Sequence, residues 1–216
     1  MAEITDFELL GQWRAGDTAA GNRLLRRHFQ SVHRFFRNKV DGDIDDLIQR
    51  TFLGLVEALP RFREHAQFKT FLLAVARNHL LLHYRERAQL QKRSAEDVSV
   101  HDLGVAAAPS GAIALREEQQ LLLTALRRLP LALQLTVELF YWERLGVDDI
   151  GLVLEIPAGT VKSRLARARD NLRATLQQLA TAPEVRTSSI SDLEQWAHSL
   201  RDVVAALDGA VSGDAP

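Results

Sequence analysis

The chain has 216 residues, of which 46% are hydrophobic and 25% are charged, so it can form one large globular domain or two small ones. Its formal net charge is −1, and any nucleic-acid site must therefore come from cations gathered in one part of the chain. The lack of cysteine excludes disulfide and thiolate chemistry, and the lack of a signal-peptide pattern or a membrane-length apolar run predicts a cytoplasmic protein without membrane insertion.

Apolar residues recur at intervals of three and four through most of the N-terminal part, a period that predicts helices and no sheet. Gly16 interrupts the first of these patterns, and either Asp17 or Thr18 is suited to cap the helix that follows. The turn at residues 41–46 is acidic. Because acids at the start of a helix stabilise its dipole, we expect a further helix to begin there.

Pro60 is expected to end that helix, and residues 61–67 are predicted to form a loop. A strongly periodic helix follows from Phe68 to about Ala88. Between residues 61 and 93, eight Lys or Arg side chains stand against two Glu, so this part of the chain is basic although the whole is not.

Composition changes at residue 94, where small residues, a Pro-Ser-Gly turn and the loss of any amphipathic face predict a flexible linker. Helical patterns then return at about 114–129, 131–144, 148–154 and up to about 179. The predicted organisation is all-α, with a first helical domain, a linker, a second helical domain and an acidic C-terminal extension that holds an amphipathic helix at about 189–208. The predicted bounds are 1–93 for the first domain, 94–113 for the linker, 114–180 for the second domain and 181–216 for the C-terminal extension.

The segment "EIPAGTVKSRLARARDNL", residues 155–172, has the pattern of a helix that reads DNA. At about 100° per residue, a narrow apolar stripe is expected to be buried: Val161, Leu165, Ala168 and Leu172. Cations lie on the two flanks of this stripe: Lys162, Arg169 and Arg173 on one, Arg164 and Arg167 on the other. The opposite face is slim: Thr160, Ser163, Ala166 and Asp170. Such a helix suits the major groove, because its cations can reach both phosphate backbones.

A short helix precedes this segment, and a tight turn at residues 155–157 opens it, which is helix-turn-helix spacing. Periodicity alone fits a solvated surface helix equally well. Residues 129–176 resemble the promoter-binding C-terminal domain of extracytoplasmic-function (ECF) sigma factors of bacterial RNA polymerase, most specifically in "GTVKSRLARAR". LuxR-type regulators share a shorter version of that string. The chain departs from the ECF pattern at Gln134, Gly151 and Glu155, the last at a turn position that often has glycine.

The N-terminal half carries a second resemblance, which LuxR-type regulators lack. The stretch "DIDDLIQRTFLGLVEALPRF", residues 43–62, is similar to the sigma helix that docks on the coiled coil of the polymerase β′ subunit. By itself the pattern also fits an ordinary capped amphipathic helix. The positions that the resemblance assigns to core polymerase binding are Asp45, Asp46, Gln49, Arg50, Phe52 and Leu53.

Residues 68–87 are similar to the sigma helix that engages the −10 element, with Phe71 where tryptophan is usual and Leu82 where aspartate is frequent. Capture of a melted strand takes polar groups and cations. The candidate −10 donors are Arg61, Arg63, His65, Lys69, Asn78 and Arg85. The residues implied to contact the −35 duplex are Thr160, Lys162, Ser163, Arg164, Arg167, Arg169 and Arg173.

Together the two resemblances imply a sigma factor rather than an enzyme, and no cofactor is expected. His79 and His83 lie four apart on a predicted helix, but no third ligand is evident, so no metal site is expected. Its implied partners are core RNA polymerase (the β′ coiled coil and the β subunit), promoter DNA, and an anti-sigma factor or another regulator. A stand-alone dimeric helix-turn-helix regulator and a helical interaction protein without a DNA role are the alternatives. The acidic C-terminal helix either packs on its own domain, or masks the recognition helix or docks a regulator.

Overall fold

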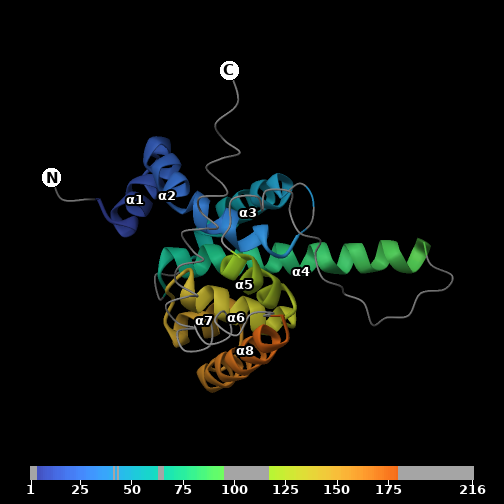
Figure 1. The fold of residues 1–216 in the computed structure, drawn as a ribbon. Helices are drawn as coiled ribbons and strands as arrows, with labels where there is room; N and C mark the ends of the chain where they lie inside the picture. Colours follow the sequence, from blue (N-terminus) through green and yellow to red (C-terminus); the bar gives the residue numbers. More distant parts are fainter. Residues whose placement is uncertain (1–3, 41, 43, 63–65, 95–116, 180–216) are drawn as a thin grey trace. The chain divides into compact units, whose positions relative to one another are not determined.

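The structure, a computed structural model, describes residues 4–40, 42, 44–62, 66–94 and 117–179 (Figure 1). Every regular element among these residues is a helix, which confirms the all-α prediction. The helices are α1 (Asp6–Arg14), α2 (Thr18–Arg37), α3 (Asp45–Ala58), the 3₁₀-helix η1 (Leu59–Arg61), α4 (Phe68–Ser94), α5 (Glu117–Arg127), α6 (Leu131–Tyr141), α7 (Val147–Leu154) and α8 (Ala158–Leu179). They form two compact units, with α1 to α4 in the first and α5 to α8 in the second.

The first two helices of the first unit begin at side-chain caps. At α1 the Thr5 N–H donates to the Glu8 carboxylate at 2.7 Å, and the Glu8 N–H donates to the Thr5 hydroxyl at 3.3 Å. This reciprocal capping box satisfies donors that the first turn leaves without helical partners. At α2 the cap is Asp17 rather than Thr18, because its carboxylate accepts two N–H groups of the first turn at 2.9 and 3.1 Å.

Helix α1 packs closely on α2. A Cβ on Gly21 would lie 2.6 Å from the Trp13 ring, so only glycine at this position lets the indole approach the α2 backbone. Leu9 and Leu10 of α1 are 1% and 2% exposed. The short helix is therefore held by burial of apolar surface rather than by its own propensity.

Helices α2, α3 and α4 pack together and share the core of the first unit. Its fully buried side chains include Leu24, Phe36, Leu55, Leu72, Leu73 and Leu80. Pro60 lies inside η1 rather than directly ending a helix, since a first turn does not use the N–H that proline lacks. Helix α4 extends to Ser94, beyond the predicted end at about Ala88.

In the second unit, α5, α6 and α7 all pack against α8. Its core includes the large side chains of Tyr141 and Trp142, each 2% exposed. Helix α6 ends at Tyr141, three residues before the predicted end, and Arg144 has φ 54, a left-handed conformation that cannot continue a helix.

Nearly all of the predicted linker at 94–113 and the whole predicted helix at 189–208 lie outside the described residues, so the domain boundaries stay predictions. Within the described part of the chain, no helix combines the length and the apolar character needed to cross a membrane. The described fold is thus two separate helical units, each with its own core.

Candidate nucleic-acid interface

The turn between α7 and α8 closes on a single carbonyl oxygen. The N–H groups of Glu155 and Ile156 both donate to Gly151, the second at 3.0 Å. Glu155 has φ 55, and a left-handed residue that carries a Cβ costs about 1–2 kcal/mol. A Cβ on Gly151 would lie 2.8 Å from the Ile156 carbonyl oxygen. The two departures from the ECF pattern, at positions 151 and 155, therefore belong to one tight turn.

One face of α8 is buried, and this burial sets the rotation of the helix about its axis. The four residues predicted to form the apolar stripe are at most 4% exposed, as expected: Val161, Leu165, Ala168 and Leu172. On the α7 side, Ile150 and Val153 are fully buried. Burying each Val or Leu side chain stabilises the unit by about 1.5–3 kcal/mol. The face of α8 opposite this stripe is consequently the one presented to solvent.

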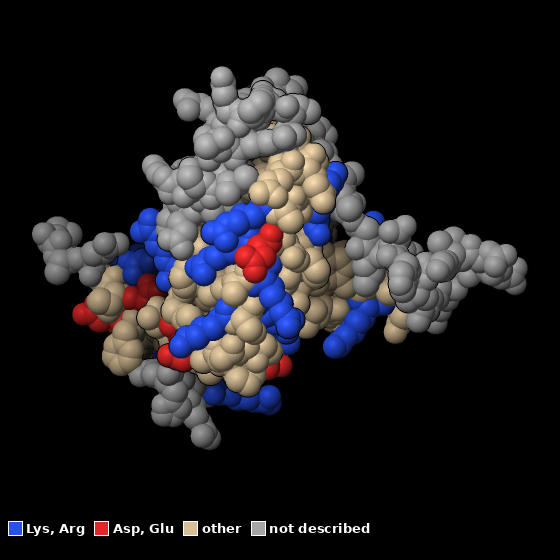
Figure 2. Space-filling view, turned by 60° about the horizontal axis from the view of Figure 1, so that its bottom comes forward, with Lys and Arg blue, Asp and Glu red and all other residues tan. Residues whose placement is uncertain are grey.

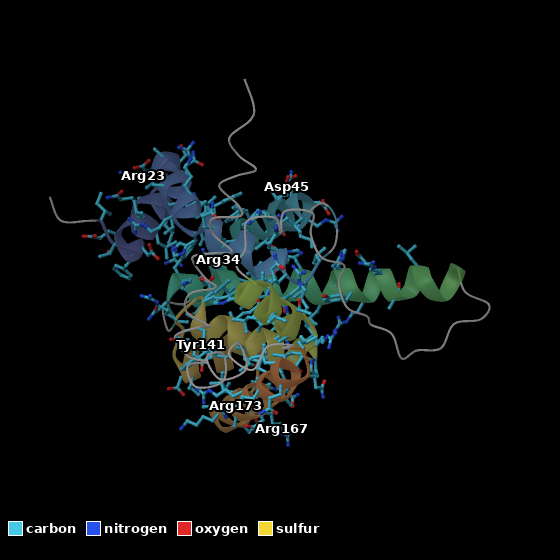
Figure 3. All side chains as sticks on the ribbon, in the orientation of Figure 1. Arg23, Arg34, Asp45, Tyr141, Arg167 and Arg173 are labelled. Carbon is cyan, nitrogen blue, oxygen red and sulfur yellow. The ribbon has the colours of Figure 1, made fainter. Side chains whose placement is uncertain are left out.

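The cations predicted for the flanks of α8 lie at its surface. Four of the predicted −35 residues are exposed: Lys162, Ser163, Arg167 and Arg173. Three are half-buried: Thr160, Arg164 and Arg169. Lys and Arg side chains gather on the face turned forward in Figure 2, where α8 lies, and Figure 3 labels Arg167 and Arg173 on this helix. The exposed part of α8 is thus a surface on which cations lie on both sides of a row of short side chains.

Arg169 has a partner in the core that periodicity could not predict. Its Nε donates to the Tyr141 hydroxyl at 2.9 Å, and its guanidinium carbon lies 5.9 Å from the centre of the Tyr141 ring. This contact joins α8 to the end of α6 through residues 28 positions apart. Tyr141 is a functional candidate that the sequence analysis missed, because an aromatic residue in an apolar helix carries no local sign of such a role.

The predicted polymerase-binding residues share one side of α3. All but one are exposed: Asp45, Asp46, Gln49, Arg50 and Leu53 (Figure 3 labels Asp45). Phe52 is half-buried and stacks on Phe29 of α2, with ring centroids 6.2 Å apart. The surface has more apolar area than predicted, since Val56 is 46% exposed and Phe29 is 40% exposed. An exposed apolar patch with charges at one end is typical of a protein-binding surface.

The buried side of α3 packs on α4 through His79. A Cβ on Gly54 would lie 2.8 Å from His79 Nε2, so the imidazole fills the space that the glycine leaves. Burial lowers the pKa of His79 below its usual value, and the nearby Arg50 cation lowers it further, against the opposing effect of Glu57. His79 therefore packs against the side of α3 that faces α4. No group of three metal-ligating side chains occurs among the described residues.

The structure does not bring the predicted −10 donors onto one face. Arg61, Asn78 and Arg85 are exposed and Lys69 is half-buried, while Arg63 and His65 lie outside the described residues. At about 100° per residue, Asn78 and Arg85 project within about 20° of each other, and Lys69 projects from the opposite side of α4. Asn78 accepts a hydrogen bond from Arg77 at 3.1 Å.

Both units match known protein families. The family model for sigma-70 region 2 matches residues 22–89, and the model for sigma-70, region 4 matches residues 119–172. The ECF RNA polymerase sigma-E factor of Haemophilus influenzae is 29% identical over 189 residues, which cover 83% of this chain and 100% of that protein. That of Escherichia coli K12 is 26% identical over 185 residues, covering 82% and 97%.

Solved structures have the same fold. CnrH, in complex with the cytosolic domain of CnrY, matches 81% of this chain and 99% of its own with a TM-score of 0.59 and 21% identity. The sigma factor RpoE of Bartonella quintana, in complex with the anti-sigma factor NepR, matches 74% and 98% with a TM-score of 0.58 and 20% identity. Because a sigma-70 region 2 match and a sigma-70 region 4 match fall in its two units, and relatives named ECF sigma factors match most of its length, the chain belongs to the sigma-70 family, as an ECF sigma factor that acts in transcription initiation.

Proposed function

We propose that the chain binds core RNA polymerase through the exposed side of α3, holds a −35 duplex with α8, and captures the melted −10 strand with the first unit. The observation that carries the proposal is the surface of α8. Its back is buried, and exposed Lys162, Arg167 and Arg173 surround a front of short side chains.

At the −35 duplex, the α8 cations reach phosphates on both sides of the major groove while Ser163 faces the base edges. Ser163 donates to the Thr160 carbonyl at 2.9 Å, so its oxygen remains able to accept from a base. The start of α8 contributes its own positive dipole to phosphate binding. Arg169, held by Tyr141, sets the position of α8 and reaches DNA from the edge of the surface.

At the −10 element, Asn78 and Arg85 offer an amide and a cation on one side of α4. Arg61 and Lys69 offer a cation at each end of the connection from η1 to α4. Single-stranded DNA binding combines such polar groups with backbone cations. Phe68 is 5% exposed and belongs to the core, so it is not a stacking platform for bases.

For polymerase binding, Asp45, Asp46 and Gln49 form a polar rim beside the exposed Leu53, an arrangement suited to a helix-to-helix interface. The Asp46–Arg50 ion pair, at 2.8 Å, is exposed, and its charges can exchange partners at little cost. The solved complex of RpoE with NepR supports a further proposal, that an anti-sigma factor or a similar regulator controls this chain.

Transcription from fragmented genomic DNA by purified core polymerase tests the proposal. We expect defined transcripts only when the chain is added, and co-purification of the chain with core polymerase. A chain that binds duplex DNA as a dimer but does not bind core polymerase would instead be a stand-alone regulator, and the proposal would be wrong.

A further inference from the structure

Helix α1 contacts one end of the connection between α3 and α4 directly and reaches the other through His28 of α2, and we propose that Arg14 and Asp6 of α1 position Arg61 and Lys69 for the −10 strand. The inference rests on the proposed −10 function. Neither residue is proposed to touch DNA. Each acts through a core aromatic residue that is the direct chain neighbour of one of the two donors: Phe62 beside Arg61, and Phe68 beside Lys69.

The first end is held by Arg14, from the last turn of α1. Its Nη2 donates to the Phe62 carbonyl at 2.7 Å and to the Leu59 carbonyl at 3.4 Å. These two carbonyls lie on either side of Arg61 in η1. A charged donor forms strong hydrogen bonds with carbonyl oxygens, so the backbone that carries Arg61 is fixed from α1.

The Phe62 side chain gives the same end a second attachment. The Arg14 guanidinium carbon lies 5.8 Å from the centre of the Phe62 ring, a cation–π arrangement. The ring in turn stacks on Phe71 of α4, with centroids 4.5 Å apart and planes at 24°. Phe62 is 8% exposed, so this stack has little room to rotate. Arg14, Phe62 and Phe71 thus form one continuous contact from α1 to α4.

The second end is held from the first turn of α1. The Asp6 carboxylate bonds His28 Nε2 at 2.6 Å, and the His28 ring lies 5.4 Å from the ring of Phe68, the first residue of α4. The other Asp6 oxygen accepts from Arg27 at 2.7 Å, which orients the carboxylate. The Lys69 charge is close enough to lower the pKa of His28, as burial does more strongly.

Helix α1 is rigid enough for this role because it is docked and capped. Trp13 packs against the α2 backbone at Gly21, and the Thr5–Glu8 capping box closes the first turn. Arg14 and Asp6 come from opposite ends of the same helix. One rigid element therefore sets the distance between the two ends of the connection between α3 and α4. Both positioning residues precede residue 22, where the match to the region 2 model begins.

The test compares the holoenzyme formed by core polymerase and the full chain with holoenzymes that carry Arg14→Met or Asp6→Ala. Each is equilibrated with a pool of short single strands that have a randomised centre, and separately with a pool of randomised duplexes, and the bound DNA is sequenced. We expect each variant to enrich the sequence preferred by the wild type about fivefold less in the single-strand pool, the loss expected for one charge-assisted contact. Enrichment in the duplex pool should not change.

A matched control separates positioning from general effects. Arg23→Met removes an exposed α2 cation whose hydrogen bond, at 3.4 Å, is to Gln12. This variant should behave like the wild type in both pools. Arg14→Lys, which keeps the charge and its ability to donate, should recover part of the lost selectivity.

The outcomes distinguish the two proposals. If the wild-type holoenzyme enriches no single-strand sequence, the proposed −10 function is wrong, and this inference falls with it. If the wild type is selective and Arg14→Met and Asp6→Ala enrich the same sequence equally well, only the positioning inference is wrong. Equal losses in both pools would show a general structural role for α1 and would also overturn it.

Discussion

Glu155 and Gly151 carry two conformational costs within one turn. Glu155 holds a left-handed backbone with φ 55, and Gly151 leaves open the space near the Ile156 carbonyl that a Cβ would occupy. A left-handed residue with a side chain costs about 1–2 kcal/mol, and a glycine inside a helix costs about 1 kcal/mol relative to alanine. Glycine at position 155 would relieve strain, whereas a Cβ at position 151 would meet the Ile156 carbonyl oxygen, so changes at the two positions should act in opposite directions.

We expect Glu155→Gly to raise the free energy of unfolding of the second unit by about 1 kcal/mol, because glycine adopts the left-handed conformation without strain. Gly151→Ala should lower it by about 1–3 kcal/mol, the range for overpacking. Urea unfolding of the full chain, followed by circular dichroism, measures both. Gly159→Ala is the control, since its Cβ would meet nothing within 4 Å. Equal stability of the two alanine variants would contradict the close approach at Gly151.

The Tyr141–Arg169 contact makes a second prediction at the scale of single residues. Tyr141→Phe keeps the ring and removes the acceptor of the 2.9 Å hydrogen bond, so we expect a loss of about 0.5–1.5 kcal/mol in stability. Because each single change breaks the same hydrogen bond, the double variant with Arg169→Gln should lose less than the sum of the single losses. Simple additivity in urea unfolding would show that the two residues act independently.

At the scale of elements, the packing of α1 on α2 should make the first unit sensitive to acid. Burial is the main cause that lowers the pKa of His28 below 6.5, and the charges of Lys69 and Arg27 lower it further, against Asp6. The unfolded chain therefore takes up a proton before the folded chain does, so this contribution to stability is present above about pH 6.5 and is lost as the pH falls through the folded pKa.

We expect the urea midpoint of the first unit to fall between about pH 7.5 and pH 5.5. His28→Gln should reduce this slope but not abolish it, because the lowered pKa of His79 acts in the same direction. The Asp6 carboxyl adds a loss only in stronger acid: burial raises its pKa, but Arg27 and His28 together bring it below 3.8. An unchanged slope in His28→Gln would show that another group controls the acid response.

The cationic surface of α8 makes a prediction about salt. If Arg164 and Arg167 each contact one phosphate, changing either to alanine should reduce the slope of log K against log salt by about 0.9 for a duplex selected by the wild type. Filter binding over a range of salt concentrations measures the slope. Arg128→Ala, at an exposed position outside α8, removes the same charge and should leave the slope unchanged. Weaker binding with an unchanged slope would mean that these arginines do not reach the backbone.

For the whole molecule, two units with separate cores predict that the two binding activities can be removed one at a time. Leu53→Asp, at a position 57% exposed, should abolish capture of core polymerase while the free chain still binds duplex DNA. The double change of Arg164 and Arg167 to alanine should do the reverse. Both proteins should fail in promoter-dependent transcription. Loss of both activities in either variant would contradict the independence of the units.

Much of the molecule follows from local sequence patterns. The apolar period predicted the helices and the buried stripe of α8, because a residue's place on a helix depends only on its spacing from its neighbours. The turn at residues 155–157 was predicted from the same spacing, and the structure adds its left-handed Glu155. The ends of α4 and α6 were less well predicted, since a helix end depends on packing and on caps that the period does not contain.

The sequence alone therefore determined the all-α class, the helix-turn-helix and the exposed cations of α8, all of which depend on contacts within a few residues. The tertiary structure decided that Arg14 reaches the Phe62 carbonyl, 48 positions away, and that Arg169 is held by Tyr141. Both pairings depend on how the helices dock on each other. Docking is set by the fit of whole buried surfaces, which no local pattern of residues specifies.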